Sequence, residues 1–139
     1  MSSDSIQENT GNKSEYWLDL CKYDLDTAKA MLKTKRYLYV GFMCHQVAEK
    51  ALKAYHSYFL KEEAPYTHSL KKLTDLTELS EELSEEQINL LIELEGMNIE
   101  ARYPTRKSEL VQQLSDEICK ELVSNTEEFL KWIQSKLSV

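Results

Sequence analysis

The clearest pattern of hydrophobic and polar positions lies in residues 37–60, which are apolar around most of a helix. At about 100° per residue, the polar side chains of this segment share one arc of roughly 140°. We name these side chains the polar stripe: His45, Gln46, Glu49, Lys50, Lys53, His56 and Ser57. A peripheral helix would show the opposite proportion, with a narrow apolar face. The pattern therefore predicts a central helix whose one polar stripe faces solvent, a ligand or a second subunit.

Helical spacing also marks the segments on either side of this one. In residues 14–34, apolar positions recur at steps of three and four after Ser14, which suits an N-cap. A shorter helix is expected to begin at Thr67 or His68 and to end near residue 80, because leucines follow there at every third position. Gly41 interrupts the long apolar helix, and a glycine inside a helix predicts close packing of another helix.

The C-terminal part of the chain predicts two more helices. Ser84 with Gln87 three residues later is a capping-box signature for a helix start, and Gly96 is expected to end that helix as its C′ residue. A connection around Pro104 leads to a long last helix over residues 108–137. No segment alternates like a strand. The sequence therefore predicts an all-α fold, an antiparallel up-and-down helical bundle of four long helices plus one short helix.

Composition is consistent with one such domain. The 139 residues, 42% of them hydrophobic and 29% charged, suffice for a core without disulfides or a metal. Residues 1–13 are polar and predict a disordered tail ahead of a helical domain at residues 14–139. The three cysteines include no CxxC pair, which argues against a disulfide framework and a thiolate zinc site and favours the reducing cytoplasm. The longest apolar run, residues 37–44, is far shorter than the ~20 residues that cross a bilayer, so no membrane segment is expected.

The net charge of −7 is concentrated in one segment. Residues 81–100 contain seven Glu and no Lys or Arg, and the rest of the chain carries 17 acids and 17 bases. Small basic groups occur in residues 29–36, at Lys71 and Lys72, and in residues 102–107. Each group suits a phosphate if the fold gathers it, or is an ordinary solvated surface. The acidic segment should repel RNA and attract a basic protein, which favours a protein partner.

A metal site with two histidines and one carboxylate can be drawn from the stripe, but the spacing of these residues does not suit it. His45 and Glu49 are one turn apart, but His45 and His56 are about 16 Å apart along the helix axis and cannot share an ion. A Glu49–Lys53 ion pair, with the histidines at helix or subunit contacts, is the simpler interpretation. Cys44 and His45 point about 100° apart, so a thiol nucleophile activated by this histidine is not supported. We expect neither a metal nor a cofactor.

Two other places carry residues suited to recognition. His68 lies at a predicted helix start, where free backbone N–H groups favour an anion and where a histidine also serves as a loop anchor. Pro104 forces Tyr103 toward an extended conformation, which sets the directions of Arg102 and the Tyr103 ring. Arg102 and Tyr103 then suit the binding of a phosphate and the stacking of a base, or form a structural corner.

Four segments, in this order and at this spacing, resemble the HEPN domain family (higher eukaryotes and prokaryotes nucleotide-binding). They are YWLDLCKYDLDTAKAML, YLYVGFMCHQVAEKALKAY, the HSLKKL string that begins at His68, and ARYP at residues 101–104. The resemblance runs from about Ser14 to the end of the chain. It implies an up-and-down helical bundle, a homodimer and, in prokaryotes, frequent pairing with a small nucleotidyltransferase. Some members of the family are the toxin half of such a pair.

The resemblance also implies a site around a groove or dimer seam. With His45 added, the candidate nucleotide- or partner-binding residues are Gln46, Glu49, Lys50, Lys53, His68, Arg102 and Tyr103. Lys50 and Lys53 would supply charge for a phosphate, and Glu49 would orient them. Members that cut RNA carry an arginine followed after four to six residues by a histidine near the start of the last helix. This chain has no histidine after Arg102 and so lacks the usual acid–base group.

The first hypothesis is therefore a non-catalytic, dimeric HEPN module that binds a nucleotide, a nucleic acid or a nucleotidyltransferase partner. An alternative is an RNA-cleaving toxin whose acid–base group comes from His45, His56 or His68. A third possibility is a purely structural dimerisation protein whose polar stripe makes only subunit contacts.

Overall fold

The computed structural model describes residues 3–102 and 114–137, with the side chains of residues 13–98 and 114–137. Its elements are α1 (Ser3–Lys33), α2 (Tyr37–Leu60), α3 (Leu70–Leu76), the 3₁₀ turn η1 (Leu79–Glu81), α4 (Glu85–Arg102) and α6 (Asp116–Lys136). No strand occurs in the described residues. The expected all-α class is confirmed: the described residues form four long α-helices and one short one, packed antiparallel.

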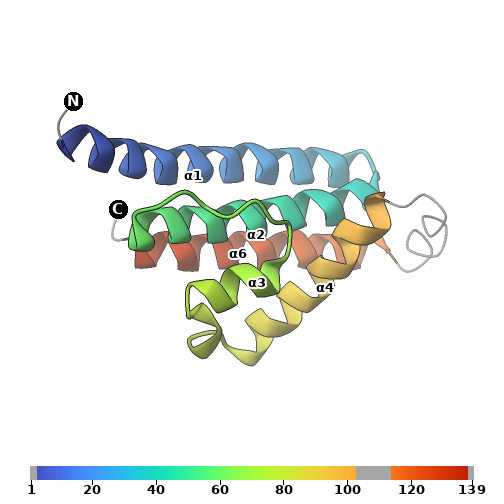
Figure 1. The fold of residues 1–139 in the computed structure, drawn as a ribbon. Coiled ribbons are helices and arrows are strands. Elements are labelled where there is room, and N and C mark those ends of the chain that lie inside the picture. The colour runs from blue at the N-terminus through green and yellow to red at the C-terminus, as the bar shows by residue number, and fades with distance from the viewer. Residues whose placement is uncertain (1–2, 103–113, 138–139) are drawn as a thin grey trace.

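Helix α2 lies at the centre of the bundle. It packs against α1, α3, α4 and α6. Figure 1 shows α1 and α6 running along α2 while α3 and α4 lie below it, and the start of α1 and the end of α6 lie at the same end of the bundle. Because neighbouring helices cover α2 from several sides, its residues are apolar around most of its circumference. The predicted central position of this helix is confirmed.

The core joins α2 to the helices around it. The largest fully buried side chains include Leu52 of α2, Leu70 and Leu73 of α3, Leu94 of α4, and Phe129 and Ile133 of α6. Full burial of each such side chain contributes about 1.5–3 kcal/mol, so the bundle is held mainly by these apolar contacts.

Helices α2 and α4 approach closely at Gly41. A Cβ atom built on Gly41 would lie 2.5 Å from Sδ and 3.2 Å from Cγ of Met97. Met97 is itself buried, with 5% of its surface exposed. The missing side chain therefore admits Met97 to the α2 surface, and this contact offsets the ~1 kcal/mol that glycine costs inside a helix. The close contact predicted at Gly41 is confirmed.

The capping box at the start of α4 is confirmed as well. The backbone N–H of Gln87 donates to Ser84 Oγ at 3.1 Å, and the backbone N–H of Ser84 donates to Gln87 Oε1 at 2.9 Å. Helix α2 ends at Leu60, and its C-cap Lys61 has a left-handed φ of 55°. The capping box is set by local chemistry, which explains why a sequence signal finds it.

Two predicted helix ends are wrong because tertiary contacts outweigh the local signals. Ser14 lies inside α1, which begins at Ser3, and its Oγ donates to the carbonyl of Ala54 at 3.1 Å instead of capping the helix. Gly96 lies inside α4, and no described glycine has a positive φ. The helix continues past Gly96 because the next residue, Met97, is buried against α2. The division of the chain at residue 13 stays a prediction.

Helix α3 starts slightly later than expected. Leu70 is its first residue and Ser69, not Thr67 or His68, is its N-cap, with Ser69 Oγ accepting from the N–H of Lys72. A serine oxygen makes this bond readily, which gives Ser69 the advantage. The predicted start of the last helix, Ser108, lies outside the described residues, and the described helix α6 is capped by Ser115.

Candidate functional site

The polar stripe of α2 is covered by the rest of the chain. Its buried members are His45, Glu49, Lys53, His56 and Ser57, and its half-buried members are Gln46 and Lys50. Helix α1 packs against α2, and the connection 61–69 runs back along α2 on its way to α3 (Figure 1). The expectation that the stripe faces solvent is therefore wrong for its buried members, whereas a ligand or a second subunit at the stripe stays a prediction. Helical periodicity shows which side chains share a face, but it does not show what covers that face.

Glu49 is the centre of this covered region. Its Oε1 accepts from Nδ1 of His68 at 2.9 Å, and its Oε2 accepts from Nζ of Lys53 at 3.1 Å. Glu49 is 3% exposed and Lys53 is 7% exposed. A buried carboxylate and ammonium compensate for lost hydration only while each keeps its partner. Glu49 therefore fastens the connection 61–69 to α2, and the predicted Glu49–Lys53 pair is present.

His45 holds the same connection through the backbone carbonyl of His68. The side chain is fully buried, and its Nε2 lies 3.1 Å from the carbonyl oxygen of His68. Because a carbonyl only accepts, Nε2 of His45 carries the proton and donates. The ring of His68 is thus held by Glu49 and its backbone by His45. This arrangement fits the loop-anchor interpretation of His68.

The two stripe lysines face carboxylates of the chain itself. Lys50 Nζ pairs with Asp24 Oδ2 of α1, and Lys53 Nζ lies over the Trp17 ring at 5.3 Å from its centroid. Sequence reasoning missed Asp24 and Trp17 as partners of the stripe. The available signal was an acid on the apolar face of the predicted first helix, seven residues after Trp17. Both lysines thus already have acidic partners within the chain, and the phosphate role predicted for them stays a prediction.

The N-terminus of α3 is also occupied by the protein. Oε2 of Glu95, from α4, accepts from the N–H groups of Leu70 at 2.9 Å and Lys71 at 3.2 Å. Free N–H groups and the helix dipole stabilise a carboxylate there. An anion at the position suggested by His68 would have to displace Glu95. Sequence reasoning missed Glu95, which is one of seven acids in its segment and has no distinguishing spacing.

Only one of the three histidines reaches solvent. The His68 side chain is 48% exposed, whereas His45 and His56 are 0% and 3% exposed as residues. Burial lowers the pKa of His56, although Glu62, with Oε1 3.7 Å from Nε2, acts in the opposite direction. Any acid–base role among the histidines would therefore fall to His68, beside the fully exposed Tyr66.

Two candidate residues cannot be placed with the others. Arg102 is the last residue of α4, and its side chain lies outside the described part of the structure, as does all of Tyr103. Their proposed contribution to the site stays a prediction. Gln46 is half-buried, and its Nε2 has no hydrogen-bond partner in the described residues.

Thiol and metal chemistry find little support in the described residues. Burial raises the pKa of Cys44 to about 12 and that of Cys119 to about 11, and burial raises the pKa of Cys21 further. These thiols are free and buried. Residues 13–98 and 114–137 contain no group of three or more His, Cys, Asp or Glu side chains placed to hold a metal ion.

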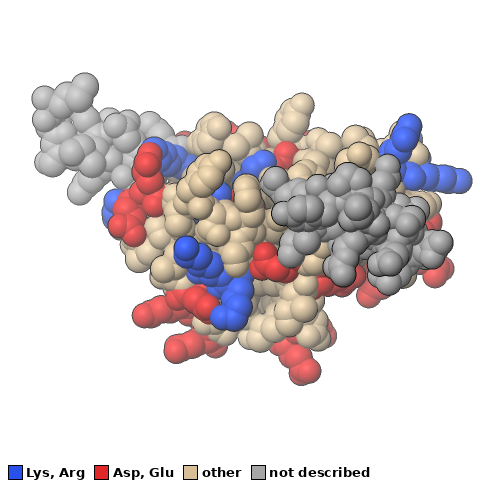
Figure 2. Space-filling model, turned by 45° about the vertical axis from the view of Figure 1, so that its right-hand side comes forward, with Lys and Arg blue, Asp and Glu red and all other residues tan. Residues whose placement is uncertain are grey.

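Acidic side chains gather at the α3–α4 end of the molecule. Figure 2 shows them along the lower edge, where Figure 1 places the turn between these helices, while Lys and Arg appear in separate small groups. A hollow of ≈ 710 Å³ between α4 and α6 is lined by Glu86, Glu93, Glu121 and Glu128 and by no described base. Partial burial raises the pKa of Glu93, and the nearby carboxylate of Glu121 raises it further. The surface of this hollow is suited to a positive group.

None of the described helices is both long enough and apolar enough to span a bilayer.

The described architecture and sequence have clear relatives. The model of the HEPN domain matches residues 14–136. The crystal structure of TT1696 from Thermus thermophilus is similar, with a TM-score of 0.72 and 22% identity over 90% of this chain and 98% of that one. ST0689, an archaeal HEPN homologue, has a TM-score of 0.62 and 18% identity over 89% and 97%. No curated protein matches significantly. At these identities the two structures show the shared fold alone.

Proposed function

Because the chain belongs to the HEPN domain family, we propose that it is a non-catalytic HEPN module that binds a protein partner with a basic surface. The nucleotidyltransferase suggested by the family resemblance is the first candidate for this partner. The expected homodimer is part of the proposal.

The observation that carries the non-catalytic role is the Glu49 network. Both carboxylate oxygens of Glu49 hold groups of the chain, and His45 is fully buried on the backbone of His68. A general acid or base must reach the proton it transfers, directly or through one water. Groups committed in this way serve folding, so function is assigned to the surface.

A protein partner is favoured over a nucleotide or RNA for two reasons. Lys50 and Lys53, the predicted phosphate ligands, pair with Asp24 and Glu49, and Glu95 fills the start of α3. Acids dominate the α3–α4 end, where net negative potential opposes a polyanion and steers a basic protein.

A second candidate rests on His68. Its Nδ1 is bonded to the Glu49 carboxylate and 48% of its side chain is exposed, so the ring is oriented by an acid while it remains accessible. A carboxylate that orients an accessible imidazole is a common arrangement for acid–base catalysis. His68 is therefore the histidine with which RNA cleavage, if present, would be tested.

The proposal is tested by co-expressing the chain with the protein encoded by the adjacent reading frame. We expect a complex that weakens as salt rises and that is weakened further by the double variant Glu81→Lys and Glu85→Lys. The matched control is Glu15→Lys with Asp26→Lys, which makes the same charge change on exposed positions of α1. Equal binding by both double variants would remove the acidic surface from the proposal.

The catalytic alternative needs its own assay. Purified protein is incubated with structured RNA, and we expect the RNA to stay intact. Cleavage that disappears in a folded His68→Gln variant would replace the non-catalytic proposal with the enzymatic one.

A further inference from the structure

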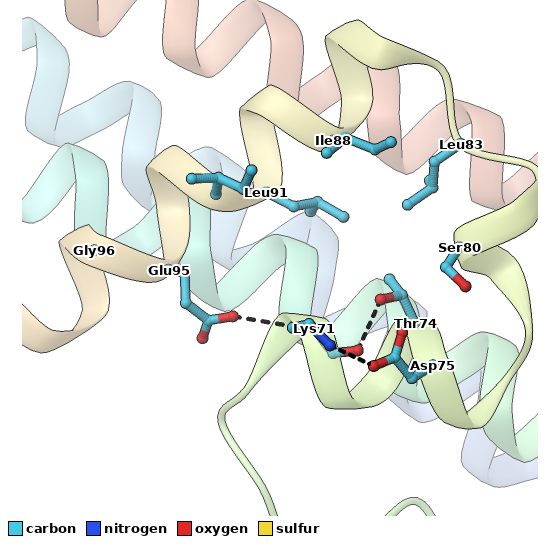
Figure 3. Close-up of a pocket in the computed structure, with 10 residues that line it drawn as sticks. Lys71, Thr74, Asp75, Ser80, Leu83, Ile88, Leu91, Glu95 and Gly96 are labelled. Carbon is cyan, nitrogen blue, oxygen red and sulfur yellow. Dashed lines mark hydrogen bonds and ion pairs between the residues drawn. The ribbon is translucent and has the colours of Figure 1, made fainter.

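A groove of ≈ 490 Å³ lies between α4 on one side and α3 with η1 on the other. Figure 3 shows the side chains of Leu83, Ile88 and Leu91 directed into it, while Lys71 and Asp75 form an ion pair on the opposite wall. The α4 side of the groove is thus apolar except for Glu95, whereas Lys71, Thr74 and Asp75 make the α3 side polar. Its volume suits a few large side chains.

The rim of the groove on α4 is exposed and apolar. Ile88 is 40% exposed and Ile92 is 67% exposed, one helical turn apart, and Gly96 follows after one more turn. Nothing in the described structure lies within 4 Å of a Cβ atom built on Gly96. Gly41 is explained by the nearby Met97, but Gly96 lies inside a helix at a cost of ~1 kcal/mol with no neighbour that requires it. A glycine beside an apolar rim permits close approach of another chain.

The other side of α4 carries charge. Glu86 and Glu93 of α4 line the acidic hollow toward α6, together with Glu121 and Glu128. The same helix therefore presents isoleucines toward the groove and carboxylates toward the hollow. Residues 81–98 contain no Lys or Arg.

We infer that the groove between α3 and α4 receives an amphipathic helix of a protein partner, whose apolar side chains enter the groove and whose Lys or Arg side chains lie over the acidic hollow. This inference deepens the proposed function and rests on it, because it names the surface and the class of partner. A helix with apolar anchors at i, i+3 or i+4, and i+7 matches an elongated apolar groove. The flanking bases match the carboxylates by charge.

Charge also argues against a second copy of this chain in the groove. Two copies that met at this groove would each bring Glu95, which lines the groove, and Glu85, in the first turn of α4, to the shared interface. Like charges placed together across an interface are unfavourable. A basic helix avoids this repulsion. Its cations also favour the ionised form of Glu93, whose pKa is raised by burial.

The test uses the full chain and a synthetic leucine–lysine peptide of roughly 18 residues, about five turns, with all leucines on one helical face. Binding is measured by fluorescence anisotropy. We expect Ile92→Ala and Gly96→Leu each to weaken binding about tenfold. The control Ile118→Ala, at a 40% exposed site on α6 that does not line the groove, should bind like the unchanged protein.

Gly96→Leu separates binding from folding. Leucine is the better helix former, and the open space at Gly96 accepts a side chain, so Tm should rise while affinity falls. A destabilised bundle would move both quantities in the same direction.

Three results would overturn the inference. The first is equal binding by a peptide of the same composition with its leucines scattered around the helix, or by a leucine–glutamate peptide. The second is unchanged peptide binding by both Ile92→Ala and Gly96→Leu. The third is a shift of the mass of the protein alone toward monomer in light scattering with Ile92→Ala, which would make a second copy the occupant.

The proposed function fails separately. Loss of peptide selectivity with intact binding of the adjacent-frame protein removes only the groove. Selective peptide binding together with His68-dependent RNA cleavage removes the non-catalytic role and leaves the groove.

Discussion

The polar stripe of α2 and the outer face of α4 make opposite use of charged residues. In the stripe, carboxylates and bases are buried and paired, with Glu49 holding His68 and Lys53. On α4, Glu86 and Glu93 line a hollow with no described base, beside the exposed Ile88 and Ile92. The ionisable residues of the stripe are therefore paired within the bundle, whereas the carboxylates that line the hollow face no described base there. A row of charged residues in a sequence does not by itself mark a binding site.

The largest loss of stability is expected when the stripe is disrupted at its centre, Glu49. Glu49→Ala removes the partner of the buried Lys53 and the acceptor of His68, and should lower the free energy of unfolding by about 3–5 kcal/mol. Urea denaturation followed by circular dichroism measures the loss. Glu85→Ala on the exposed start of α4 is the control and should change stability by less than about 0.5 kcal/mol. Equal effects of the two variants would contradict the contrast between the regions.

The next effect concerns the connection 61–69. His68→Ala removes a hydrogen bond to a buried carboxylate, and should cost about 1–2 kcal/mol because the imidazole is half-exposed. Hydrogen exchange should speed up in residues 61–69 more than in α6. Uniform faster exchange through the whole bundle would show that His68 is not a local anchor.

A smaller loss of stability is expected when the contact between α1 and α2 is weakened at Ser14. Ser14→Ala removes the bond from Ser14 Oγ to the Ala54 carbonyl at a site that is 3% exposed, and should cost about 1 kcal/mol. Thermal unfolding measures it. If Ser14 capped the helix from outside the bundle, Ser14→Asp would preserve stability. We expect Ser14→Asp to be worse than Ser14→Ala, because it buries a charge.

The smallest expected effect is a gain of stability, and it concerns Glu93 of α4. The pKa of Glu93 is raised in the folded state by partial burial and then by Glu121, so its ionisation opposes folding. Its favourable contribution is full below the pKa of the unfolded chain and is lost as the pH rises through the folded pKa. Glu93→Gln should therefore stabilise the protein at pH 7 by less than about 1 kcal/mol, after screening by solvent. The gain should vanish near pH 4, and a loss at pH 7 would contradict this account.

The sequence predicted those features that depend on neighbouring residues. Ser84 and Gln87 form their capping box because both partners lie within one turn. The central place of α2 followed from apolar positions around the helix, and Gly41 correctly indicated a close helix contact. The same kind of reasoning failed at Gly96, where α4 continues because Met97 is buried against α2.

The sequence by itself determined the helical class, the family and the set of polar side chains on one face of α2, since periodicity is a property of the local chain. Only the tertiary structure decided that this face is covered, because the connection 61–69 and α1 bring His68, Asp24 and Trp17 to it from outside α2. It likewise decided which surface remains, the groove and the acidic hollow on the two sides of α4. The free energy of a buried charge depends on the partner that reaches it, and that partner is chosen by the packing of distant segments.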